Sequence, residues 1–172
     1  CVGTSICRDA RGAPAGEAAI RRLQDVKPAT KMRQWLLALL ATIVLHNLEE
    51  ASAIAIAPHS LWGAIQATGL ALAPPPLGAI YAGLALFAIV PAIVLLRTVG
   101  RPSPAGLFLS CMIAAMVLAN AVFPHLALTV LTGRYTPGAI SAVVLSLPIA
   151  GGTLHAAWKG RWTGRVPLAG AI

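Results

Sequence analysis

Residues 35–57 read WLLALLATIVLHNLEEASAIAIA, and this stretch determines the class of fold. It is long enough to cross a bilayer as a helix, which takes roughly 20 predominantly apolar residues. It nevertheless contains Glu49 and Glu50, which are the only acidic residues after Asp25. The stretch therefore predicts a transmembrane helix whose two carboxyl groups need polar partners inside the membrane.

Three further apolar stretches follow along the chain, at about residues 77–96, 105–131 and 137–158, and none contains an acidic residue, a lysine or an arginine. The whole chain is 58% hydrophobic and 10% charged, whereas soluble domains carry about 25% charged residues. We therefore expect an all-α fold, in which residues 34–160 form one membrane domain, a four-helix transmembrane bundle.

The connection between the first two stretches carries no acidic residue, lysine or arginine, and it predicts a short interfacial helix at about residues 61–72, closed by Pro74, Pro75 and Pro76. The spans are rich in alanine and glycine, and such small side chains let helices pack closely in lipid. Proline in the last three spans predicts kinks, because it lacks the amide that an α-helix uses; these prolines are Pro91, Pro124 and Pro148.

The basic residues predict the orientation of the spans. Residues 1–33 hold seven of the 13 lysines and arginines, and three more follow the last span, whereas the loops expected on the other side hold only Arg134. Positive charge marks cytoplasmic segments, so we expect a multi-pass protein of the bacterial cytoplasmic membrane with both termini in the cytoplasm. The net charge of +8 is not accompanied by a nucleic-acid-binding motif, and the sequence predicts no nucleic-acid partner.

Both ends of the chain differ from the membrane domain. Residues 1–33 lack apolar periodicity and are expected to be a flexible basic leader, or a translation artefact that precedes a true start near Met32. A mature lipoprotein would also begin with a cysteine such as Cys1, but its basic segment would then lie outside, against the charge pattern. Residues 161–172 are expected to be a basic cytoplasmic tail. The three cysteines form no CxxC pair, which argues against a disulfide framework or a zinc finger.

Polar side chains inside the spans are the candidate functional residues. At 100° per residue, His46, Glu49 and Glu50 share one face of a helix, and that face cannot point at lipid. Span three supplies Asn120 at a depth similar to that of Glu50, and His125 about 7 Å nearer the outer surface, so contact between the spans is geometrically feasible. Pro124, between them, has no amide for the carbonyl of Asn120, so a kink is expected beside the imidazole.

Several of these motifs resemble one known family. The segment His46-Asn47-Leu48-Glu49-Glu50 is similar to the signature of the HXXEE family of small bacterial multi-pass membrane proteins, whose function is not established. The resemblance extends to Asn120-Ala121-Val122-Phe123-Pro124-His125, then to Arg134-Tyr135-Thr136-Pro137-Gly138 and to Pro148, over about residues 35–158. The resemblance implies that the chain has the fold of this family, and it implies no particular reaction or ligand.

Three functions remain open on the sequence. In the first, the site consists of His46, Glu49, Glu50 and His125, with Asn120 in its outer shell. The two histidines and one glutamate bind a divalent metal (zinc, iron or manganese), and the other glutamate is a general base on a bound water. The substrate would then be a lipid or another apolar molecule. In the second, the carboxyl groups titrate as a proton or a small solute crosses the membrane. In the third, they form a structural polar cluster, so the sequence leaves open whether the protein is an enzyme, and it does not indicate an oligomeric state.

Overall fold

The structure is a computed structural model that describes residues 15–69, 72–160 and 162, with side chains from residue 30 onward. It divides into two units, residues 1–31 and residues 32–172, and the second contains all of the apolar stretches. Helix α1 (Ala15–Ile56) begins inside the segment that was expected to be a flexible leader. Residues 1–14, 161 and 163–172 lie outside the described residues, so the assignments of a leader and a cytoplasmic tail stay predictions.

Four helical segments are long and apolar enough to cross a membrane: residues 30–56 of α1, α3 (Leu77–Gly100), residues 104–132 and residues 139–160. No strand occurs among the described residues. The prediction of an all-α bundle of four spans is confirmed, with ends within a few residues of those expected. Between spans one and two, the predicted short helix is α2 (Ser60–Ala67), which ends earlier than the sequence suggested.

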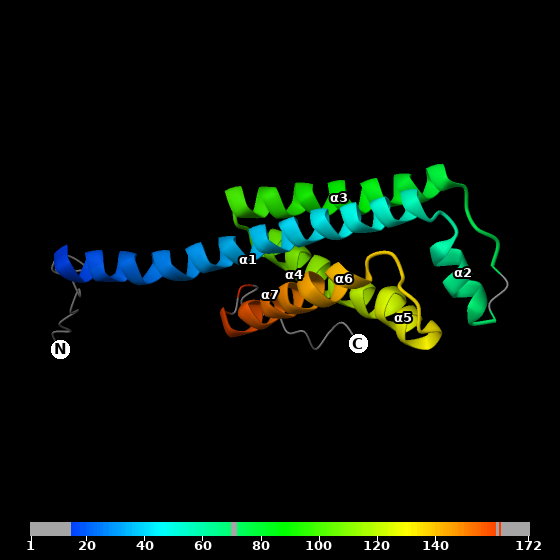
Figure 1. Ribbon diagram of the computed structural model, residues 1–172. Coiled ribbons are helices and arrows are strands. Elements are labelled where there is room, and N and C mark those ends of the chain that lie inside the picture. Colours follow the sequence, from blue (N-terminus) through cyan, green and yellow to red (C-terminus); the bar gives the residue numbers. More distant parts are fainter. Residues whose placement is uncertain (1–14, 70–71, 161, 163–172) are drawn as a thin grey trace, which may run out of the picture. The chain divides into compact units, whose positions relative to one another are not determined.

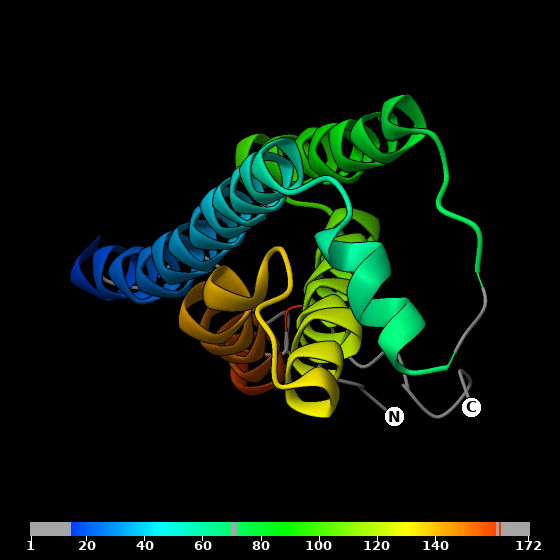
Figure 2. The same ribbon diagram turned by 45° about the vertical axis from the view of Figure 1, so that its right-hand side comes forward.

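Spans three and four are each built from several pieces. Span three consists of α4 (Pro104–Asn120), a π-helical turn (Ala121–Leu126) and α5 (Ala127–Thr132). Span four consists of α6 (Ala139–Ser141), a π-helical turn (Ala142–Ser146) and α7 (Leu147–Gly160). The α4 helix packs against both α3 and α7, and Figures 1 and 2 show α4 between these two helices.

A buried apolar cluster joins all four spans. It combines Leu36, Leu39 and Ile43 of α1 with Leu95 of α3, Ala114 of α4 and Ala150 of α7. The alanines let the helices approach closely, as the composition predicted. The ring of Trp35 packs directly against the α-carbon of Gly152, where no side chain could be accommodated without displacing it.

The prolines have different effects on the three spans that contain them. In span three, Phe123 has an extended backbone (φ −134°, ψ 123°), the Phe123–Pro124 peptide bond is cis, and the helix is kinked there as expected. In span four, Pro148 follows the π-helical turn. The α3 helix stays helical through Pro91, and a kink or loosening of span two there stays a prediction. One missing backbone hydrogen bond is tolerated in a membrane helix when the neighbouring residues keep theirs.

The contact between Trp35 and Gly152 predicts an effect on stability. Gly152→Ala should lower the free energy of unfolding by about 1–3 kcal/mol, because the new methyl group would overlap the indole ring. The adjacent Gly151 has open space where a Cβ would be placed, so Gly151→Ala is the matched control and should not destabilise the protein. Unfolding of both variants in detergent, followed by circular dichroism, measures the difference; equal stabilities would contradict the prediction.

Candidate metal centre

His46 is buried on the inner face of α1, with 6% of its surface exposed. Its Nδ1 lies 2.8 Å from the hydroxyl of Ser141, and that hydroxyl also lies 3.2 Å from the carbonyl oxygen of Gly138. Since the Ser141 hydroxyl has one proton and donates it to the carbonyl, it accepts a hydrogen bond from Nδ1. The hydrogen-bond network therefore assigns the proton of a neutral His46 ring to Nδ1 and leaves the lone pair of Nε2 free.

His125 follows the break at Phe123 and is almost completely buried, at 1% exposure. Its ring lies 4.7 Å from that of His46, measured between centroids, in an edge-to-face arrangement. Its Nδ1 is buried and has no hydrogen-bond partner among the described residues. The kink in span three thus brings a second imidazole beside the one from span one.

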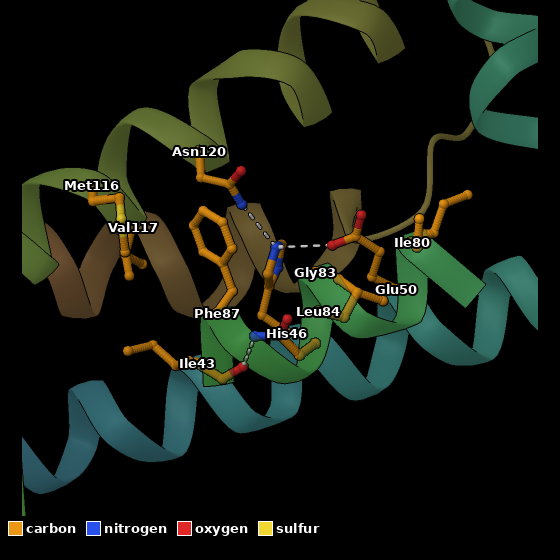
Figure 3. A pocket seen from close by; sticks show the side chains of 12 residues that line it. Ile43, His46, Glu50, Ile80, Gly83, Leu84, Phe87, Met116, Val117 and Asn120 are labelled. Atoms are coloured by element: carbon orange, nitrogen blue, oxygen red, sulfur yellow. Dashed lines mark hydrogen bonds and ion pairs between the residues drawn. The ribbon is translucent and has the colours of Figure 1, made fainter. Parts of the chain in front are cut away.

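Asn120 shows where the two imidazoles point. Its side-chain nitrogen lies 3.2 Å from Nε2 of His46 and 3.2 Å from Nε2 of His125. One amide group can donate to both rings only when both Nε2 lone pairs face the same point. Figure 3 shows Asn120 reaching from α4 toward the imidazole of His46, which confirms that these polar groups of spans one and three lie together.

Glu50 brings a carboxylate to the same point. Its Oε2 lies 3.9 Å from Nε2 of His46 and 4.0 Å from Nε2 of His125, and these three atoms all lie within 4.8 Å of one another. Ligand atoms of a tetrahedral zinc ion lie about 3.4 Å apart, given bonds of about 2.0–2.1 Å. The distances from Glu50 to the two imidazoles would have to shorten by about 0.5–0.6 Å for the three side chains to bind one divalent ion, and the Asn120 amide would have to give up its contacts with the two Nε2 atoms.

Glu49 lies outside this group, although the sequence analysis placed it with the imidazoles. Its Oε1 accepts hydrogen bonds from the hydroxyl of Tyr135 (2.6 Å) and the amide of Ile140 (3.2 Å), and its Oε2 accepts one from the amide of Ser141 (2.7 Å). Consecutive residues point about 100° apart on a helix, so the two glutamates face different neighbours. Glu49 caps the amino end of span four, where the helix dipole favours a carboxylate.

The loop between spans three and four supplies buried residues next to the two imidazole rings. Thr136, Pro137 and Gly138 are buried, and the hydroxyl of Thr136 donates to the carbonyl of His125 (2.8 Å). Gly138 has a φ of +84°, and a Cβ there would lie 2.8 Å from Cε1 of His125 and 2.9 Å from Cε1 of His46. The fold therefore requires glycine here for its conformation and for the space that the rings occupy.

Two other histidines lie apart from this group of side chains, whereas Ser141 contacts it. His59 precedes α2, His155 lies on α7, both are exposed, and neither belongs to the group of three ligand atoms. Ser141, which orients His46, was not predicted. The signal that could have indicated it is a hydroxyl residue one helical turn after Pro137-Gly138, at the start of span four.

Fold and site together define a multi-pass helical membrane protein with a buried cluster of histidine and glutamate. The family model described as a protein of unknown function with HXXEE motif matches residues 35–151, which are 117 of the 172 residues. The chain therefore belongs to the HXXEE family. No match was found among curated proteins or among solved structures.

A substitution of Gly138 has two effects, contact with the imidazole rings and strain from the positive φ, and a comparison with Gly133 separates them. Gly133 also has a positive φ, of +63°, but a Cβ there would meet nothing within 4 Å. Alanine at either position carries a backbone penalty of about 1–2 kcal/mol. Gly138→Ala should lower the free energy of unfolding by about 1–3 kcal/mol more than Gly133→Ala, because it also displaces the imidazoles. Equal losses in thermal unfolding of the two variants would show that the rings are not constrained there.

The bond between Tyr135 and Glu49 predicts an unusual titration. Partial burial and the hydrogen bond to Glu49 raise the pKa of Tyr135 to about 12. A raised pKa stabilises the fold while the phenol is protonated, and this contribution decreases as the pH rises from about 10 to about 12. In a Tyr81→Phe background, Tyr135 should ionise near pH 12, and Glu49→Gln should move the transition toward pH 10. Ultraviolet absorbance of phenolate measures this, with circular dichroism as the control for folding.

Proposed function

We propose that this protein is a membrane-embedded enzyme that uses one divalent metal ion, bound by His46, Glu50 and His125. The observation that carries the proposal is the convergence of three ligand atoms within 4.8 Å of one another inside the bundle. Two imidazoles and one carboxylate are a donor set that zinc and non-haem iron use, and manganese also accepts it. Ionisable side chains are expensive in a membrane span, which favours a functional site over an accidental cluster.

The side chains next to the three proposed ligands support metal binding. Ser141 fixes His46 with Nε2 directed at the proposed ion, as hydrogen-bonded outer partners do in metal sites. Three protein ligands leave a coordination position for water or substrate, and the ion would act there as a Lewis acid. Asn120 lies beside that position and can donate a hydrogen bond to a substrate oxygen.

The two glutamates take different roles in this proposal. Of the carboxylates in the described part of the chain, only Glu50 lines the cavity next to the imidazoles. Glu50 is therefore the metal ligand, and its second oxygen is the group available to accept a proton. Glu49 positions the buried loop and the start of span four through its hydrogen bonds. A direct catalytic or ligand role for Glu49 would require its side chain to rotate away from these partners.

The proposed site belongs to a protein of the bacterial cytoplasmic membrane with both termini in the cytoplasm, as its basic residues suggest. The outer ends of the spans are then those next to α2 and to the loop at residues 133–138. Glu50 lies six residues before the end of span one, or about 9 Å along the helix. The metal centre would therefore be reached from the outer half of the membrane, and a lipid or another apolar molecule is its proposed substrate.

One observation favours a purely structural cluster instead. The amide of Asn120 already provides a hydrogen bond to both Nε2 atoms, so the rings are satisfied without an ion. Such a cluster would stabilise the packing of spans one and three and would bind no metal. Transport of protons or a small solute would also need no metal, and it would appear as uptake in vesicles that depends on Glu50.

Metal content distinguishes these functions. Elemental analysis of protein purified in detergent should find about one divalent ion per chain, and His46→Ala or Glu50→Gln should lower the occupancy at least about tenfold, because each removes a ligand. His155→Ala is the matched control, since this histidine is exposed on α7, and it should keep the ion. A folded wild-type protein without metal, or equal metal in all variants, would refute the proposal.

A further inference from the structure

A cavity of about 270 Å³ adjoins the candidate metal centre and lies among α1, α3 and α4. Its polar lining consists of His46, Asn47, Glu50 and Asn120. The rest of the lining is apolar, from residues such as Ile43, Phe87 and Met116. Figure 3 shows Met116 and Val117 on one side of His46, and Glu50 and Ile80 on the other.

The polarity of the cavity changes along the direction of the helices. Ile43, Phe87 and Met116 each lie near the middle of their spans, which are residues 30–56, 77–100 and 104–132. Glu50 lies seven residues beyond Ile43, about 10 Å nearer the end that leads to α2. The cavity therefore extends from an apolar end near the membrane centre to a polar end nearer one surface, which is the polarity of a lipid in that leaflet.

Several side chains that line the cavity are exposed on the surface expected to face lipid. Phe87 and Met116 are 51% and 37% exposed, and Ala79 is exposed as well. Gly83 of α3 lines the cavity and has nothing within 4 Å of the position of a Cβ. At about 270 Å³ the cavity is slightly smaller than pockets for drug-sized ligands, which occupy about 300–1,000 Å³, so it can enclose a segment of one chain and not a complete two-chain lipid.

We propose that the cavity binds one acyl chain of a membrane phospholipid, entering laterally between α1, α3 and α4, with its ester end at His46 and Glu50 and its methylene groups along Phe87 and Met116. This inference rests on the proposed function, because it names a membrane phospholipid as the substrate of the proposed metal centre. Chain binding itself needs only the cavity, so it can be tested separately from metal binding.

The test uses a phosphatidylglycerol that carries a photoreactive diazirine midway along one acyl chain, incorporated into nanodiscs with the full-length protein. After illumination, mass spectrometry should find the label on peptides that contain Ile43, Phe87 or Met116. Gly83→Leu adds a side chain to the cavity wall at a position where a Cβ would meet nothing within 4 Å, and it should lower labelling there by about tenfold. Gly78→Leu places the same side chain elsewhere on α3, where a Cβ also meets nothing within 4 Å. This variant should be labelled as strongly as the wild-type protein.

Metal content is measured on the same samples. Gly83→Leu should keep its metal while losing the label, and Glu50→Gln should lose metal while keeping the label. Equal labelling of Gly83→Leu and Gly78→Leu, or label confined to residues outside the cavity, would overturn the assignment of the cavity to a lipid chain. A wild-type protein that is labelled in the cavity but holds no metal would refute the proposed enzyme and support the chain-binding site.

Discussion

The structure depends on the cost of placing two adjacent carboxyl groups in a membrane span. Each would cost about 2.5–3.5 kcal/mol at the centre of an isolated helix. Neither is left facing lipid alone: Glu49 accepts hydrogen bonds from Tyr135, Ile140 and Ser141, and Glu50 faces the imidazoles and a cavity. Because neighbouring residues on a helix point in different directions, the same requirement ties span one both to span four and to span three.

The loop at residues 133–138 links the two glutamates. Tyr135, on this loop, donates to Glu49, while Gly138 lies against both imidazoles and its carbonyl accepts from Ser141. The loop that donates a hydrogen bond to Glu49 therefore also contacts the rings of His46 and His125.

Much of the fold and part of the site could be predicted. Length and apolar composition identify spans because a bilayer imposes a fixed thickness, and the kink at Pro124 follows from a missing amide. Helix depth also placed Asn120 level with Glu50, whereas His125 was expected about 7 Å further out and instead lies with its ring 4.7 Å from that of His46. At Pro91, by contrast, α3 stays helical. The buried loop could not be predicted, because Thr136, Pro137 and Gly138 are equally compatible with an exposed turn.

The sequence by itself determined that four apolar helices form the protein and that His46, Glu49 and Glu50 share a face that must avoid lipid. Only the tertiary structure decided which carboxyl group meets which partner. Helical spacing gives the direction of a side chain relative to its own helix, but not which neighbouring helix lies there. The rotation of span one places Glu50 beside the two imidazoles and Glu49 at the start of span four, and this choice results from the packing of all four spans.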